Sequence, residues 1–378
     1  MRTIEIEPEK SASRYDQLAS YCESNLLSSD RTFCCANADA CRQSIRGDWK
    51  IYEGQCSYLG EHYEALDDGH PMRILVVAMQ TGRPNVGVDL QRRRSQLQRS
   101  RDKPYSGSDS RNAHMKGVTT ALKVLWGIDP TSGSEGELLE TNRGQVHLFD
   151  TFAMANATLC SRIKVGSAKG QGTNVMLDRC SKHLRETIRI LEPTIIHSQG
   201  RQKAGRCTHT SVEAACDEIE WIDDYVARVR IGDVRAVWVS LRHPSMQWGK
   251  QQLKDVVIPA LERARSLSRS QECPVCRTPV PHVARHPRYL CESCASEACS
   301  SDGRALEFSN VDISGGFEAV YADTGAPYEG HVCFVRGFEC WADEYRFGGI
   351  VIEVRDPDSD LRGTATPRPR GFRRPRPS

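Results

Sequence analysis

Short runs of consecutive apolar residues recur along the first two thirds of the chain. They lie at residues 73–78, 147–153, 194–197 and 235–241. Runs of this length without a polar alternation are typical of strands that are buried on both faces of a parallel sheet. We therefore expect four such strands.

Between and after these runs, apolar residues recur at helical spacing. Four segments carry such a stripe, at residues 118–126, 177–191, 212–226 and 253–261. Strands that alternate with helices predict an α/β fold of three layers, α/β/α, around a central parallel sheet. Because such sheets bind ligands at the carboxyl ends of their strands, the residues after each strand are the first candidates for a site.

The pattern also divides the chain into regions. Residues 1–70 are rich in cysteine and precede the α/β core, which we place at 71–268. A polar, arginine-rich insertion at 91–111 interrupts this core and is longer than an ordinary connection. Residues 269–355 show strand-like alternation and predict a small β-rich module, and the Arg/Pro tail at 356–378 cannot form a core, so we expect it to be disordered.

Composition narrows the class of protein. The 378 residues favour more than one domain, and 39% hydrophobic with 26% charged residues is typical of a soluble globular chain. Since no apolar run is long enough to span a bilayer and the first residues do not resemble a secretion signal, we expect a cytoplasmic location and no membrane partner. The formal net charge is +2, yet the last 18 residues carry six arginines and no acid, which suggests an anionic partner.

Sixteen cysteines in a chain without a recognisable export signal favour metal ligation over disulfides. Two Cys-x-x-Cys pairs are separated by 14 residues, a spacing that suits a four-cysteine zinc site. The alternative is a set of packing thiols. The zinc ligands we predict are Cys273, Cys276, Cys291 and Cys294.

Three short motifs follow the predicted strands. They are Ala-Met-Gln-Thr-Gly at 78–82, Asn-Ala-Thr-Leu-Cys at 156–160 and His-Pro-Ser at 243–245, with a further cysteine at position 180 on the next helical segment. In this order the motifs resemble the uracil-DNA glycosylase superfamily, in particular its iron–sulfur branch. No single motif is specific, but the ordered set is, and the resemblance covers roughly residues 34–265.

The resemblance implies a uracil-DNA glycosylase-like fold and an enzyme that flips a base out of DNA and hydrolyses its N-glycosidic bond. Three residues receive catalytic roles from it. Asn156 would read the edge of the base through its amide, and His243 would bond the base oxygen on which negative charge develops. Gln80 stands where relatives carry an acid and would orient the attacking water; the alternative is a turn residue without function. No lysine matches a Schiff-base position, so the product would be an intact strand with an abasic site.

Other residues are placed around the base and the DNA backbone. Met115 stands where relatives carry a phenylalanine that stacks on the base, and a pocket without that ring could admit a base larger than uracil. The alternative is an alignment error across the insertion. The predicted base pocket contains Met79, His114 and Met115. The predicted DNA-phosphate contacts are Ser245, Arg92, Arg93 and Arg94; the alternative for the insertion is a solvated loop.

These departures leave the substrate open between uracil and a modified pyrimidine, and we favour the latter. Glucosylated hydroxymethylcytosine in phage DNA, with a role in anti-phage defence, is one example. The competing hypothesis is a catalytically inactive DNA-binding sensor on the same fold. A nucleoside hydrolase that acts on small molecules is disfavoured by the basic insertion and the zinc module.

The resemblance also implies a 4Fe-4S cluster held by four thiolates, with a structural role. Cys160 and Cys180 match two of the ligands. The other two come from the five cysteines between positions 22 and 56, among which we choose Cys35 and Cys41, with Cys34 as the next candidate. The alternative is a group of buried structural cysteines.

Overall fold

The computed structural model describes residues 4–30, 32–79, 89–165, 170–201, 206–246, 248–281, 286, 288–311, 316–344 and 349–355. The chain divides into two compact units, Met1–Arg269 and Ser270–Ser378. Among the helices in this described part of the chain, none is both long and apolar enough to cross a membrane.

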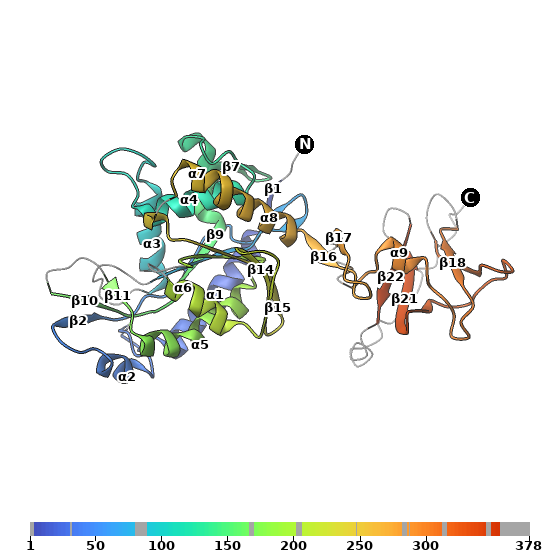
Figure 1. Ribbon diagram of the computed structural model, residues 1–378, viewed down its shortest axis with the longest axis horizontal. Helices are drawn as coiled ribbons and strands as arrows, with labels where there is room; N and C mark the ends of the chain where they lie inside the picture. Colours follow the sequence, from blue (N-terminus) through green and yellow to red (C-terminus); the bar gives the residue numbers. More distant parts are fainter. Residues whose placement is uncertain are drawn as a thin grey trace, which may run out of the picture. The chain divides into compact units, whose positions relative to one another are not determined.

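A seven-stranded mixed sheet forms the centre of the first unit (Figure 1). The four strands β15, β12, β6 and β9 are parallel neighbours, whereas β13, β14 and β3 pair antiparallel at its two edges. The predicted α/β class is therefore confirmed, but the sheet is parallel only at its centre. The order across the sheet is β13 (Glu218–Trp221), β14 (Val226–Ile231), β15 (Val234–Leu241), β12 (Ile195–Gln199), β6 (Ile74–Ala78), β9 (Phe152–Asn156) and β3 (Tyr58–Leu59).

Helices cover both faces of this sheet. Ile74 and Val76 of β6 share one core cluster with α4 (Ala113–Leu125) and α8 (Ile258–Ser268). The alternate residues Leu75 and Val77 belong to a second cluster with three other helices. Since successive side chains of a strand point to opposite faces, the continuous apolar run of β6 serves both clusters. The helices of the second cluster are α1 (Pro8–Asn25), α5 (Asn174–Leu191) and α6 (Arg206–Ala215).

Two predicted elements are wrong in their extent. The strand predicted from residue 147 begins only at Phe152, because Leu148–Thr151 forms a 3-10 turn, η2, that starts where His147 Nδ1 accepts a bond of 3.0 Å from the Phe149 amide. The helix predicted over 212–226 ends at Ala215, and the apolar residues after it belong to the β13–β14 hairpin. Three apolar residues at a spacing of three or four match a helix and a hairpin equally well.

The arginine-rich insertion contains a helix, α3 (Leu90–Arg101), which the sequence did not predict. Its first turn is capped by Asp89, whose side chain accepts a bond from the Arg92 amide. Leu90, Arg93 and Leu97 form its buried face. The insertion therefore packs onto the unit through one narrow row of side chains.

The first unit also contains short elements outside the main sheet. They are β1 (Ile4–Ile6), α2 (Ala38–Gln43), β2 (Trp49–Tyr52), β4 (Ala65–Asp67), β5 (His70–Pro71), η1 (Ser134–Glu137), β7 (Leu138–Thr141), β8 (Gly144–His147), β10 (Ser161–Lys164), β11 (Gly170–Gln171), η3 (Pro244–Met246), α7 (Lys250–Gln252) and η4 (Leu253–Val257).

The second unit consists mostly of short antiparallel strands around one short helix (Figure 1). Its core cluster combines apolar side chains such as Val335 and Ile352 with cysteines that include Cys273 and Cys294. Its elements are β16 (Ser270–Glu272), β17 (Pro279–Pro281), α9 (Glu292–Ala295), β18 (Leu306–Ser309), β19 (Glu318–Tyr321), β20 (Val332–Val335), β21 (Phe338–Glu344) and β22 (Ile350–Val354).

Candidate functional site

The carboxyl ends of the four parallel strands gather the polar side chains of the sequence motifs. Asn156 is the last residue of β9, and Gln199 is the last residue of β12. Met79 follows β6 directly, and His243 lies two residues after β15. Because these strands are neighbours in the order β9, β6, β12 and β15, the four residues lie along one edge of the sheet. Gln80, the predicted water-positioning residue, lies outside the described residues.

Asn156 is buried, with 6% of its surface exposed, and is held by a second amide. Its Nδ2 donates a hydrogen bond of 2.8 Å to Gln55 Oε1. The Gln55 backbone in turn donates to the Leu159 carbonyl, 3.1 Å away, on the chain just after β9. This bond orients the plane of the Asn156 amide and leaves that side chain with further hydrogen-bonding capacity for a ligand.

His243 is held in one tautomer by the residue that follows Pro244. The Ser245 amide donates to His243 Nδ1 at 3.2 Å, and Ser245 Oγ lies 2.7 Å from the same nitrogen. Since a backbone amide can only donate, Nδ1 is the acceptor, and the proton of the neutral ring is on Nε2. Burial lowers the pKa of His243, so the ring is uncharged at neutral pH. Ser245, predicted to contact phosphate, is thus tied to the imidazole.

Helix α4 brings a second imidazole to the site. The rings of His114 and His243 are stacked, 5.9 Å apart and 13° from parallel. Burial, together with the nearby His243, lowers the pKa of His114 to about 3. The helix approaches closely because Gly117 has no side chain: a Cβ there would overlap Pro244 Cγ and lie 3.3 Å from Gln199 Nε2.

The buried polar side chains of this region bond little outside their own group. The His114 ring interacts with the Gln199 side chain, and the His197 ring interacts with the Val239 backbone, although neither contact has good hydrogen-bond geometry. His197 and Gln199 are fully buried on β12, at the centre of the carboxyl edge. A buried polar atom without a well-formed hydrogen bond costs about 1–3 kcal/mol, so a concentration of them is typical of a place where a ligand supplies the missing bonds.

The remaining predicted residues of the base and phosphate contacts are distributed differently. Met115 packs in the core cluster beneath α4, with 5% of its surface exposed, and His114 is its neighbour that faces His243. Arg92 is exposed on α3. Arg94 pairs with Glu61 at 3.3 Å, whereas Arg93 is turned inward and is 9% exposed. The structure therefore places Arg93 inside the unit and not on the surface predicted to face phosphates.

The connections that leave these strands are strongly basic. Residues 79–90, 157–173, 200–206 and 242–250 together contain nine lysines and arginines and a single acid, Asp89, which caps α3. We call these four segments the basic rim; a concentration of basic residues of this kind attracts a polyanion. The nine cations are Arg83, Arg162, Lys164, Lys169, Arg201, Lys203, Arg206, Arg242 and Lys250. Among the nine cations, the structure describes the side chains of Arg162, Lys164, Arg201, Arg242 and Lys250.

Four cysteines gather beside β9 from separate segments. Cys41 and Cys160 share a small core cluster with Met176, and the charge states of Cys35, Cys41, Cys160 and Cys180 influence one another. Burial raises the pKa of Cys160 and of Cys180 to about 12. These thiols therefore stay protonated unless a metal displaces their protons.

The surroundings of this cysteine group suit sulfur ligands. The Leu159 amide donates to Cys180 Sγ at 3.4 Å, and the Asn37 amide donates to Cys35 Sγ at 3.5 Å. Their sulfurs are more widely spaced than those of the four-cysteine set in the second unit, which alone among the described residues lies within 4.8 Å. Thiolates around one zinc ion are about 3.8 Å apart, so the wider spacing fits a larger cluster better.

The other cysteines of the amino-terminal segment are placed differently. Cys34 is exposed, and Cys22 and Cys56 are buried next to each other. This arrangement favours Cys35 and Cys41 among the five candidates.

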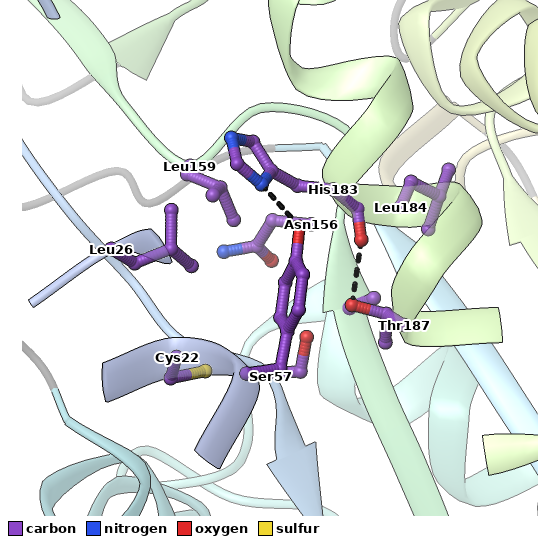
Figure 2. A pocket seen from close by; sticks show the side chains of 10 residues that line it. Cys22, Leu26, Ser57, Asn156, Leu159, His183, Leu184 and Thr187 are labelled. Atoms are coloured by element: carbon purple, nitrogen blue, oxygen red, sulfur yellow. Dashed lines mark hydrogen bonds between the residues drawn. The ribbon is translucent and has the colours of Figure 1, made fainter. Parts of the chain in front are cut away.

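A small cavity is lined by Asn156 together with residues of α1 and α5, among them Tyr21 and His183 (Figure 2). His183 projects into it, and its Nδ1 lies 2.6 Å from Tyr21 Oη while its Nε2 lies 3.5 Å from Cys35 Sγ. The cavity has room for about one water molecule and is too small for a base.

In the second unit, the four cysteines of the two Cys-x-x-Cys pairs come together. Their sulfurs all lie within 4.8 Å of one another, and Cys276 Sγ is 3.4 Å from Cys291 Sγ. Hydrogen bonding by Thr278 lowers the pKa of Cys276 to about 6. This confirms that the four cysteines form a site that could bind a metal ion.

Three residues of the edge were not found from the sequence. Gln55, His197 and Gln199 lie outside the three motifs and were not among the predicted site residues. The one available signal was the position of His197 and Gln199 at the end of a strand, where ligands of α/β sheets bind. Gln55 carried no signal, because it reaches Asn156 only through the tertiary fold.

No protein-family model matches this sequence, and a comparison with curated proteins finds no significant match.

Proposed function

We propose that the protein is a monofunctional DNA glycosylase with a uracil-DNA glycosylase-like, three-layer fold. The observation that carries the proposal is an uncharged donor set, Asn156 and His243, fixed at a sheet edge whose connections are basic and contain one acid. The basic rim would hold the DNA backbone through sequence-independent contacts. The amide and imidazole would hold the flipped base.

The chemistry needs little from the protein beyond position and electrostatics. When the bond between C1′ and the base nitrogen breaks, its electron pair leaves with the base and positive charge forms on the sugar. A water molecule then adds to C1′, and the proton that it gives up ends on the departed base, which leaves an abasic site and the neutral free base. His243 would donate from Nε2 to the base oxygen on which charge develops, as a neutral imidazole can in a dry site. Gln55 would act as a positioning residue, since it orients the Asn156 amide.

The substrate we favour is a modified pyrimidine, with glucosylated hydroxymethylcytosine of phage DNA as the example, and anti-phage defence as the role. Support comes from the placement of Met115 in the core: the side chain at this position does not supply an aromatic lid. Uracil is the other candidate.

Two metal centres belong to the proposal. Cys35, Cys41, Cys160 and Cys180 would hold a structural 4Fe-4S cluster, supported by their wide spacing and the amide N–H groups directed at two of the sulfurs. Zinc is the ion we assign to the four-cysteine site of the second unit.

The proposal is tested by base release from two DNAs, one with uracil and one with glucosylated hydroxymethylcytosine, followed by alkali to reveal abasic sites. We expect release from the modified DNA, and a loss of about 10²–10³-fold in single-turnover rate for Asn156→Ala and for His243→Ala. Asn25→Ala, an exposed asparagine on α1, is the matched control.

Each outcome decides between the functional hypotheses. Release of uracil alone would identify a repair enzyme. DNA binding without release from either DNA would contradict the glycosylase and support the inactive sensor.

A further inference from the structure

Arg93 is a buried cation without an anionic partner. Its Nη1 donates to Gln96 Oε1 at 3.1 Å, its Nη2 contacts Met154 Sδ at 3.3 Å, and its Nε has no partner. Its pKa is lowered by burial to about 10, so the guanidinium is still charged at neutral pH. Among the described residues, no carboxylate pairs with it.

The rest of the unit cannot supply that anion either. Between residues 1 and 269, the segments that the structure does not describe contain no Asp or Glu. The groups that act electrostatically on Arg93 are the Cys56 thiol and the Tyr58 phenol, neither of which is a carboxylate, and burial raises the pKa of Tyr58. A buried charge that lacks a partner is strongly unfavourable, so this arrangement favours a ligand that brings negative charge.

The position of Arg93 indicates which part of a substrate it meets. Met154, its contact, lies two residues before Asn156 on β9, about 7 Å along the strand. The charge of Arg93 also contributes to the lowered pKa of His114, whose ring stacks on that of His243. Arg93 therefore lies beside the residues that would enclose the base, whereas its neighbour Arg92 is exposed where a phosphate could reach it.

We propose that Arg93 is a base-pocket residue whose guanidinium binds the departing base and balances the negative charge that forms on it. The inference rests on the glycosylase activity proposed above and adds a residue to it. The electron pair of the broken N-glycosidic bond stays on the base, and Arg93 neither gains nor loses a proton. Asn156 and His243 would hold the base by neutral hydrogen bonds, and Arg93 supplies the one full positive charge.

The test compares Arg93→Met and Arg93→Lys with the wild type in the full-length protein. Single-turnover base release is measured on whichever of the two DNAs the wild type cleaves. Arg93→Met should release the base about 10²-fold more slowly with unchanged affinity for DNA, and Arg93→Lys, which keeps the charge, should be intermediate. Arg99→Met, which removes an exposed arginine from the same helix, is the matched control.

Urea unfolding provides a readout that does not depend on activity. Replacing an unpaired buried charge by an apolar side chain of similar length is neutral or stabilising, so the unfolding midpoint of Arg93→Met should be unchanged or higher. A clearly lower midpoint would show that the guanidinium is a structural element and would overturn the inference.

Two kinetic outcomes would also overturn it. Weaker DNA binding with an unchanged rate would identify Arg93 as a phosphate contact. If the wild type releases base from neither DNA, the glycosylase proposal fails and the leaving-base role fails with it, while the unfolding comparison still shows whether Arg93 is an unpaired buried charge.

Discussion

At the scale of single residues, the candidate site depends on imidazoles that stay uncharged. Burial lowers the pKa of His114 to about 3 and that of His197 to about 4, and it lowers the pKa of His243 in the same direction. A neutral ring accepts on one nitrogen and donates from the other. His243 can therefore be fixed by Ser245 and still present a proton to a ligand without repelling the cations of the rim.

The buried neutral state of His197 makes stability depend on pH. Its pKa is about 4 in the folded protein and about 6.5 when unfolded, so the unfolded chain binds the proton first. Above pH 6.5 the residue has no effect; the free energy of unfolding then falls as pH drops from 6.5 to 4, by about 3 kcal/mol in total. Urea unfolding of wild type and His197→Asn at pH 7.5 and pH 5 tests this: the variant should lose less stability than the wild type between the two pH values. An equal loss in both proteins would contradict it.

At Gly117, one added methyl group should reduce function much more than it reduces stability. In Gly117→Ala the new Cβ meets Pro244 of the His-Pro-Ser turn. Overpacking of this kind lowers the free energy of unfolding by about 1–3 kcal/mol. The better helix propensity of alanine raises it by up to about 1 kcal/mol. The rate of base release should fall strongly while the urea midpoint falls only slightly, because the turn that fixes His243 moves. Gly133→Ala, where a Cβ meets nothing within 4 Å, is the control and should change neither. Equal release by Gly117→Ala and wild type would show that the turn tolerates displacement.

The sequence predicts only part of this site, for a physical reason. Asn156 and His243 could be found because they follow strands directly, so one local motif places each at the carboxyl edge. Gln55 and Gln199 could not, because their roles depend on which distant atoms they meet. Arg93 was predicted only as a phosphate contact, and its inward placement was missed for the same reason. An arginine on a polar helix gives no sign in the sequence that it is the one turned inward.

At the scale of elements, the features set by a local sequence pattern were again predictable, and those set by tertiary contacts were not. The runs at β6, β12 and β15 were predictable because strands buried on both faces carry uninterrupted apolar residues. The antiparallel edges were not, since β13 is mostly exposed and the apolar residues of the β13–β14 hairpin match a helical spacing. Helix α3 was also missed, because its buried face contains an arginine between two leucines.

The segment between α1 and α2 offers a test of the cluster assignment in adjacent residues. Cys34 is exposed, whereas Cys35 lies against His183 and its sulfur accepts an amide N–H bond. In anaerobically purified protein, Cys35→Ser should lose iron and its visible absorbance, and Cys34→Ser should keep both. Iron retained in Cys35→Ser but lost in Cys34→Ser would show that Cys34, and not Cys35, is the cluster ligand. Wild-type protein without iron would contradict the cluster.

At the scale of the whole molecule, basic residues are concentrated in particular segments. The formal net charge of +2 conceals nine lysines and arginines in the four segments that follow the parallel strands and six arginines in the last 18 residues. Since the total is nearly neutral, the net charge alone would not predict a polyanionic partner. The uneven distribution of the basic residues does predict one, because electrostatic attraction depends on the local potential and acts over about 10 Å at ordinary salt.

The two units should also respond separately to metal loss. In the second unit, Cys273 and Cys294 are fully buried members of the core cluster, so the metal site and the apolar core stabilise each other. Cys291→Ser should therefore lose the bound metal and unfold this unit, because binding free energy at a four-cysteine site is folding free energy. Hydrogen exchange resolves the effect: protection should vanish in β20–β22 and persist in β6 and β12. Cys299→Ser, a cysteine of the same unit outside the set, should keep metal and protection. Protection that persists in β20–β22 of metal-free Cys291→Ser would mean that the apolar core alone holds this unit together.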